Sequence, residues 1–133
     1  MAQSPRWIRP VAIPAALFGV ATIYSGGTAL FGGAAAREAV GDAVPLVLWF
    51  NFLAGFAYIL GAVAMFIRAP WARLVAWLIA ASTLLVFAIF AVMALSGTPF
   101  EWRTVGAMVL RSGFWLAIAL ALSRAAQRNP QLR

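Results

Sequence analysis

The chain has 133 residues, of which 65% are hydrophobic and 10% charged, and its formal net charge is +7. A soluble domain is about half apolar and roughly a quarter charged, so this composition excludes a soluble globular fold, a disordered chain and a collagen-like chain. The sequence contains no Cys and no His, which excludes disulfides, cysteine-bound zinc and catalytic triads that need histidine.

Four apolar segments are each long enough to cross a bilayer as a helix, which takes about 20 residues. In chain order they are Val11–Phe31, Leu46–Ile67, Leu74–Leu95 and Val105–Leu122. Their apolar residues surround each helix instead of forming one stripe, as expected for helices embedded in lipid. Because the connections are short, neighbouring helices are expected to be antiparallel. The sequence thus predicts an all-α integral membrane protein, in which residues 1–133 form one up-down bundle of four transmembrane helices.

The first segment has an alternative interpretation as a secretory signal peptide. Arg6 and Arg9 precede it, and the run Ala34–Ala36 follows it with the small residues of a cleavage site. However, the apolar core is longer than the ~7–15 residues of a signal peptide and contains the polar run Tyr24–Thr28. We therefore expect the first segment to remain as a membrane helix.

The charges between the segments predict the orientation of the bundle. One side carries seven arginines and no acid: Arg6, Arg9, Arg68, Arg73, Arg124, Arg128 and Arg133. The other side carries Arg37 and Arg103 with all three acids, Glu38, Asp42 and Glu101. Because loops rich in arginine stay on the cytoplasmic side, both termini are expected to be cytoplasmic, in a bacterial inner membrane. The lipid bilayer, and no nucleic acid, is the partner that this basic surface indicates.

Helices in lipid associate through small residues that allow close approach. Such residues recur at four-residue spacing on all four segments: Ala15 and Gly19, Ala57 and Gly61, Ala76 and Ala80, and Gly113, Ala117 and Ala121. We expect these faces to pack within the bundle, with a homo-oligomer contact as the alternative.

Arg111 is the one charged residue deep inside a predicted span. It lies roughly 9 Å from the start of the fourth segment, at 1.5 Å per residue, where a charge costs ~2.5 kcal/mol or more unless it finds a partner or reaches the surface. The sequence predicts an outward-opening polar pocket formed by Arg111, Asn51, Tyr24, Arg103, Glu101 and Thr28. In it, Arg111 is expected to hydrogen-bond Asn51 or Tyr24. Arg111 then serves either as a structural clamp or as the binding group for an anion or an amphiphile head group.

No motif for a phosphate loop, a zinc protease or a hydrolase nucleophile accompanies these residues. Three acids in two segments are a weak basis for a metal site, and no catalytic residue or cofactor is expected. The sequence therefore predicts a non-enzymatic, multi-pass membrane protein, an accessory or interaction subunit of a larger membrane complex or a homo-oligomer. The alternative is a small transporter or binding protein for an anionic or amphiphilic solute, using Arg111 and Asn51.

Overall fold

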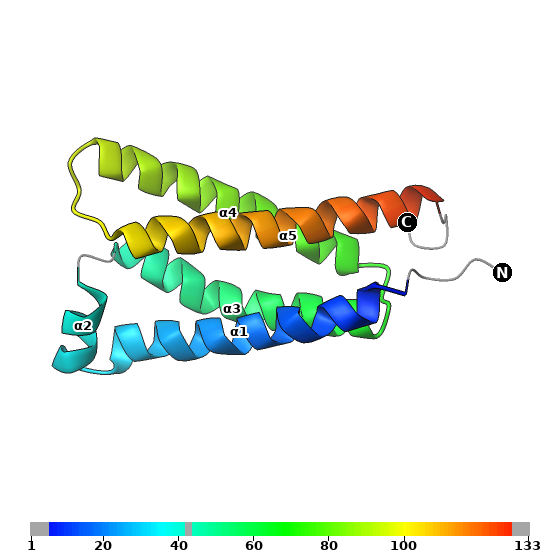
Figure 1. The fold of residues 1–133 in the computed structure, drawn as a ribbon, viewed down its shortest axis with the longest axis horizontal. Coiled ribbons are helices and arrows are strands. Elements are labelled where there is room, and N and C mark those ends of the chain that lie inside the picture. Colours follow the sequence, from blue (N-terminus) through cyan, green and yellow to red (C-terminus); the bar gives the residue numbers. More distant parts are fainter. Residues whose placement is uncertain (1–5, 42–43, 129–133) are drawn as a thin grey trace.

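The computed structural model describes residues 6–41 and 44–128, which are all-α, with no strand in these two ranges and 86% of the residues in helices. The helices are α1 (Ile8–Phe31), α2 (Ala34–Val40), α3 (Pro45–Phe66), α4 (Ala72–Leu95) and α5 (Trp102–Arg128). The four long helices lie side by side along the long axis of the molecule (Figure 1). The start of α1, the α3–α4 connection and the end of α5 lie at one end, whereas α2 and the α4–α5 connection lie at the other.

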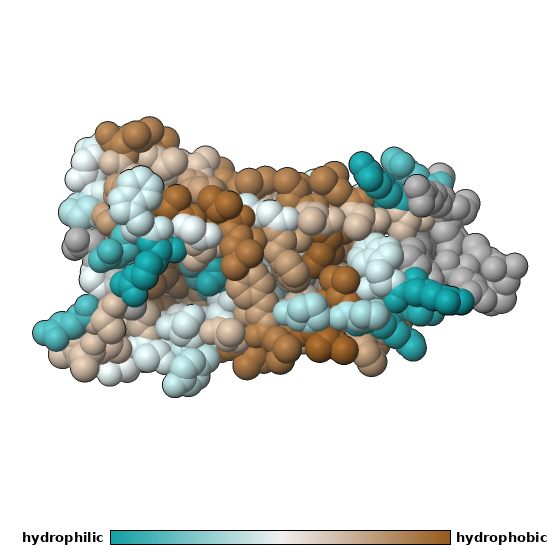
Figure 2. All heavy atoms as spheres, in the orientation of Figure 1, coloured by the Kyte–Doolittle hydropathy of each residue, from teal (hydrophilic) through white to brown (hydrophobic). Residues whose placement is uncertain are grey.

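The four long helices are long and apolar enough to cross a membrane, as the sequence predicts. The 24 residues of α1 extend about 36 Å at 1.5 Å per residue, which exceeds the ~30 Å hydrocarbon core of a bilayer. Large aliphatic side chains point outward from every long helix, with Leu17, Leu53, Leu78 and Leu110 each at least 60% exposed. Figure 2 shows hydrophobic residues over the middle of the visible face and hydrophilic residues at both ends. This surface is compatible with a multi-pass membrane protein.

The arginines divide between the two ends of the described chain. Arg6, Arg9, Arg68, Arg73 and Arg124 belong to the end where α1 begins, and Arg37 and Arg103 belong to the end that holds α2. Asp42, Arg133 and the side chain of Arg128 lie outside the described residues, so the structure bears on five of the seven arginines that the sequence assigns to the first end.

The closest helix pair is α1 with α3, and small residues cause this closeness. The buried positions of α1 repeat at alternating spacings of four and three residues: Ile8, Ala12, Ala15, Gly19, Thr22, Gly26 and Ala29. An added Cβ on Gly19 would lie 3.0 Å from the Gly55 carbonyl oxygen, and one on Gly55 would lie 3.0 Å from the Gly19 carbonyl oxygen. The backbones therefore touch at Gly19 and Gly55, since no side chain separates them.

Helix α5 lies against the bundle with a different face from the predicted one. Gly113 and Ala117 are exposed, and nothing lies within 4 Å of a Cβ added to Gly113. Trp115 is instead 0% exposed, and its indole occupies the space left by Gly61 of α3. The expectation that the Gly113 stripe packs within the bundle is therefore wrong, because burying the large indole turns the small residues outward.

Large side chains fill the space between the α1–α3 pair and the α4–α5 pair. The Tyr58 ring lies 5.5 Å from Phe18 and 5.3 Å from Trp115, measured between ring centroids. Phe18 also meets Phe114 edge to face at 5.5 Å. This aromatic layer crosses the middle of the bundle. The small-residue predictions hold for Ala15 and Gly19 of α1 and for Ala76 and Ala80 of α4, which are buried, whereas on α3 Gly61 is buried and Ala57 is partly exposed.

The connection between the first two spans contains a helix where the sequence predicts only a loop. The run Ala34–Ala36 forms the first turn of α2, in keeping with the high helix propensity of alanine. Gly33 and Gly41 flank α2 with φ of 88° and 59°, values that glycine adopts without steric cost. The C-terminal end of this short helix contacts the side chains of Glu101 and Arg103, where the candidate site begins.

Candidate functional site

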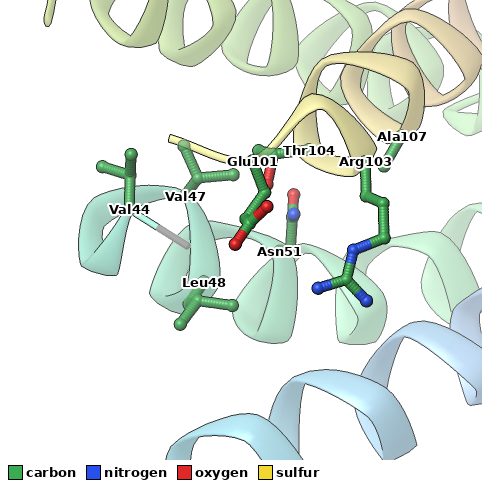
Figure 3. Close-up of a pocket in the computed structure, with 8 residues that line it drawn as sticks. All are labelled: Val44, Val47, Leu48, Asn51, Glu101, Arg103, Thr104 and Ala107. Carbon is green, nitrogen blue, oxygen red and sulfur yellow. The ribbon is translucent and has the colours of Figure 1, made fainter. Parts of the chain in front are cut away.

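A pocket of about 170 Å³ opens between the first turns of α3 and α5, at the end of the molecule that holds α2 (Figure 3). We call it the α3–α5 pocket. Its lining comprises Val44, Val47, Leu48 and Asn51 from α3 and its N-cap, and Glu101, Arg103, Thr104 and Ala107 from α5 and the residue before it. The spacing of three and four residues places each set on one helical face. The pocket has apolar walls and a few polar groups, as small-molecule sites commonly do.

Asn51 supplies the polar centre of the α3–α5 pocket. Its side chain extends from α3 between Glu101 and Arg103 (Figure 3). The Asn51 Oδ1 atom is buried and has no hydrogen-bond partner among the described residues. Leaving a buried acceptor unpaired costs about 1–3 kcal/mol. A molecule that donates a hydrogen bond in this pocket would remove that cost.

Glu101 and Arg103 connect the mouth of the pocket to α2. The Arg103 Nη2 group donates a hydrogen bond to the Ala39 carbonyl oxygen at 3.1 Å. The Glu101 carboxylate lies against Gly41, where any side chain would collide with it. Both charged residues therefore hold the end of α2 over the start of α5. The end of α2 is thus tied to two of the residues that line the pocket.

Arg111 lies one turn deeper than Ala107 on the same face of α5, about 6 Å further along the helix axis. Its Nη1 group donates a hydrogen bond of 2.9 Å to the Thr22 Oγ1 atom of α1. The guanidinium carbon also lies 5.2 Å from the centroid of the Phe18 ring, a cation–π contact. Arg111 is thus bonded inside the bundle, as expected.

The partners predicted for Arg111 are wrong. Asn51 Oδ1, the acceptor of that side chain, has no hydrogen bond, and Tyr24 is 76% exposed. Thr22 takes their place because it occupies a buried position of α1. Tyr24 lies two residues later, which is about 200° around the helix axis and places it on the outside. Thr28 donates to the Tyr24 carbonyl oxygen of its own helix at 2.8 Å and does not reach the site.

Four buried polar atoms on α3 and α5, one of them on Arg111, form no hydrogen bond among the described residues, and we call them the buried donor cluster. Its members are Arg111 Nε, Tyr58 Oη, Ser112 Oγ and Trp115 Nε1, which lack hydrogen-bond partners in the described chain as Asn51 Oδ1 does. Tyr58 and Trp115 are 0% exposed, and Ser112 is 6% exposed. Arg111 and Thr83 lie close enough to the Tyr58 hydroxyl to interact with it electrostatically. Native interiors leave few such groups unpaired.

The chemistry of the buried donor cluster favours a negatively charged or oxygen-rich molecule. Arg111 Nε and Trp115 Nε1 only donate, whereas the Tyr58 and Ser112 hydroxyls donate and accept. The guanidinium is the only formal charge among them. Carboxylates, phosphates and water supply the acceptors that such a set requires.

Sequence analysis missed Thr22, Tyr58, Ser112 and Trp115 because each lies in an apolar run, where single polar atoms attract no notice. The four-three spacing of α1 could have identified Thr22, since it is the one hydroxyl that falls on that face. Tyr58 could have been identified from its spacing, since it follows Asn51 by seven residues and therefore lies two turns along α3 on the same side of the helix.

The described residues 6–41 and 44–128 contain no group of three His, Cys, Asp or Glu side chains that could hold a metal ion. Comparison with known proteins found no family model, no curated protein and no solved structure that matches this chain. The α3–α5 pocket and the buried donor cluster are therefore the features that indicate a function for this chain.

Proposed function

We propose that the chain is a multi-pass protein of a bacterial inner membrane, an up-down bundle of four spans with both termini cytoplasmic. The four long apolar helices support the membrane assignment. The five arginines described at the α1 end, without any acid, support the orientation, because arginine-rich connections stay cytoplasmic. In this orientation the α3–α5 pocket opens on the opposite, outer side.

The function that this geometry favours is non-enzymatic binding, with or without transport, of a small anionic amphiphile. The observation that carries the proposal is the Arg111 Nε atom, which is buried without a hydrogen-bond partner on a side chain that faces the Tyr58 hydroxyl. An acidic head group entering from the pocket supplies acceptors to these donors. A guanidinium binds carboxylate or phosphate through two parallel hydrogen bonds, so Arg111 suits either head group.

The donors follow the pocket-lining residues closely along α3 and α5. Ala107 lines the pocket and Arg111 follows one turn later on α5, while Asn51 lines it and Tyr58 follows about 10 Å later on α3. The walls contributed by Val44, Val47 and Leu48 suit a hydrocarbon chain. The ligand class is therefore an alkyl carboxylate or alkyl phosphate rather than a fully hydrated inorganic ion.

A thermal-shift experiment on the purified protein in neutral detergent tests this function. Decyl phosphate and decanoate are the ligands, and decanol is the control with the same chain and no anion. A ligand at 100 times its Kd adds about 2.7 kcal/mol to stability, so both anions should raise the Tm while decanol should not.

Arg111→Leu should abolish the shift, and Arg111→Lys should weaken it, because lysine keeps the charge and loses the planar fork. Tyr24→Leu is the matched control on the exposed face and should respond as wild type. Arg111→Gln, which keeps hydrogen-bond donors but no charge, provides a second variant if Arg111→Leu does not fold. An undiminished shift in folded Arg111→Leu would mean that Arg111 is a structural clamp.

A second candidate function is that of an accessory or interaction subunit in a larger membrane complex or a homo-oligomer. The outward face of α5 favours it, because Gly106, Gly113 and Ala117 leave that face open to close approach. Gly113→Leu would block such a contact without touching the bundle. Co-purification from native membranes before and after this substitution tests the candidate, since a true partner is lost from the variant.

A further inference from the structure

A second hollow lies on the side of the molecule, far from the α3–α5 pocket. It is a groove of about 290 Å³ between α1 and α3, near the start of α1, and we call it the α1–α3 groove. Alanines form its floor, with Ala12 and Ala62 2–3% exposed. Ile13, Leu17 and Val63 form its walls and are 47–65% exposed. Every side chain that lines the groove is apolar.

A cation is held at the end of this groove. Phe66 closes the groove, and the Arg9 Nε group donates a hydrogen bond of 3.0 Å to the Phe66 carbonyl oxygen. The Arg9 guanidinium carbon lies 5.5 Å from the centroid of the Phe66 ring. The hydrogen bond uses only the Nε nitrogen, and the ring contact holds the plane of the guanidinium in place. Its two terminal nitrogens remain on an exposed side chain, where they can donate to an acidic group.

We propose that the α1–α3 groove binds an anionic phospholipid of the surrounding bilayer, with one acyl chain over Ala12 and Ala62 and the phosphate on Arg9. The inference rests on the membrane insertion proposed above, and it is independent of the solute site. The groove opens sideways onto the apolar surface, at the level where bilayer lipids lie. Arg6 precedes α1 and Arg68 follows α3, so both add positive charge at the same end, which attracts anionic head groups.

The charge at this end favours lipid over a second copy of the chain. The three acids of the sequence are Glu38, Asp42 and Glu101, and the two that are described belong to the opposite end of the molecule. Two copies that met across this groove in parallel would place their arginines together with no acid nearby, and like charges repel. An anionic phospholipid instead neutralises Arg9 and fills the hollow.

Native mass spectrometry of the delipidated protein in neutral detergent tests the inference. Phosphatidylglycerol is titrated against phosphatidylcholine with the same acyl chains. We expect one phosphatidylglycerol to bind about fivefold more tightly, because both lipids offer a phosphate to Arg9 but the choline cation of phosphatidylcholine offsets that charge. Equal affinity for both lipids would overturn the proposal, and so would a dimer that forms without lipid and occupies the groove.

Three variants separate the contributions. Arg9→Gln should lose most of the preference for phosphatidylglycerol, whereas Arg124→Gln, at the same end but away from the groove, should change the affinity less than twofold. Ala16→Leu should narrow the groove and weaken both lipids. If Arg9→Gln and Arg124→Gln had equal effects, the preference for phosphatidylglycerol would come from general surface charge, and the site would be refuted. Unchanged binding by Ala16→Leu would refute acyl-chain occupancy.

Flotation of the protein with phosphatidylcholine vesicles distinguishes failure of this inference from failure of the proposed membrane function. A protein that does not float lacks membrane insertion, which refutes both proposals. A protein that floats but shows no preference for phosphatidylglycerol refutes the lipid site alone.

Discussion

Replacing Gly55 by alanine adds one methyl group at the point where α1 and α3 touch. That methyl would lie 2.6 Å from Ile23 Cγ1, 3.0 Å from the Gly19 carbonyl oxygen and 3.1 Å from the Ile23 amide nitrogen. The Ile23 side chain can rotate away, but the two backbone atoms cannot. The α1–α3 pair must therefore separate to accept the methyl group, and this loosens contacts along the whole interface.

The size of the effect follows from two opposing contributions. Overpacking a tight interface costs about 1–3 kcal/mol, and the contact with backbone atoms places Gly55→Ala toward the upper part of this range. Alanine recovers about 0.8–1.0 kcal/mol through its higher helix propensity. The net expectation is a loss of about 1–2 kcal/mol in the free energy of unfolding.

Gly113→Ala is the matched control, because it makes the same substitution in α5, where nothing lies within 4 Å of the new Cβ. It should be neutral or stabilising by up to about 1 kcal/mol. The difference between the two variants isolates overpacking and should be about 2–3 kcal/mol. Reversible unfolding in mixed micelles, with helicity measured by circular dichroism, provides both values. A difference below about 0.5 kcal/mol would contradict the close packing at Gly55.

Three further predictions concern topology, processing and the α4–α5 contact. Reporter fusions at the C-terminus and within α2 should give opposite signals, cytoplasmic for the first and external for the second; matching signals would exclude the proposed orientation. The intact mass of the protein from membranes should include α1, whereas a chain beginning near Arg37 would mean that the first segment is a cleaved signal. Ser123→Ala removes the acceptor of the Trp77 Nε1 hydrogen bond at 2.8 Å and should cost about 0.6 kcal/mol in the same unfolding assay. A loss above about 2 kcal/mol would contradict this expectation, because it exceeds what one intramembrane hydrogen bond contributes to the free energy of unfolding.

The four long helices were predictable because their causes are local. About 20 consecutive apolar residues specify a long apolar helix without reference to the rest of the chain. The helix α2 was missed because seven residues between glycines give no periodic signal. Its formation depends on contacts such as the Arg103 hydrogen bond to Ala39, which joins residues far apart in the sequence.

The candidate site was predictable only in part. Arg111 could be identified from the sequence, because a charge inside an apolar segment is costly whatever the tertiary structure around it. Its partner depends on the rotation of α1 about its own axis. Thr22 faces the bundle and Tyr24 faces outward, although both are polar residues at similar depth.

By itself, the sequence determined the helical class, the four apolar segments, the unequal distribution of arginine and the importance of Arg111. Each of these follows from composition or from residues close together in the chain. Only the tertiary structure decided which face of each helix is buried, and hence that Trp115 lies inside while Gly113 lies outside. The physical reason is that helices apolar on all sides carry no stripe to orient them. Their rotation is set by how large and small side chains, such as Trp115 and Gly61, fit together in three dimensions.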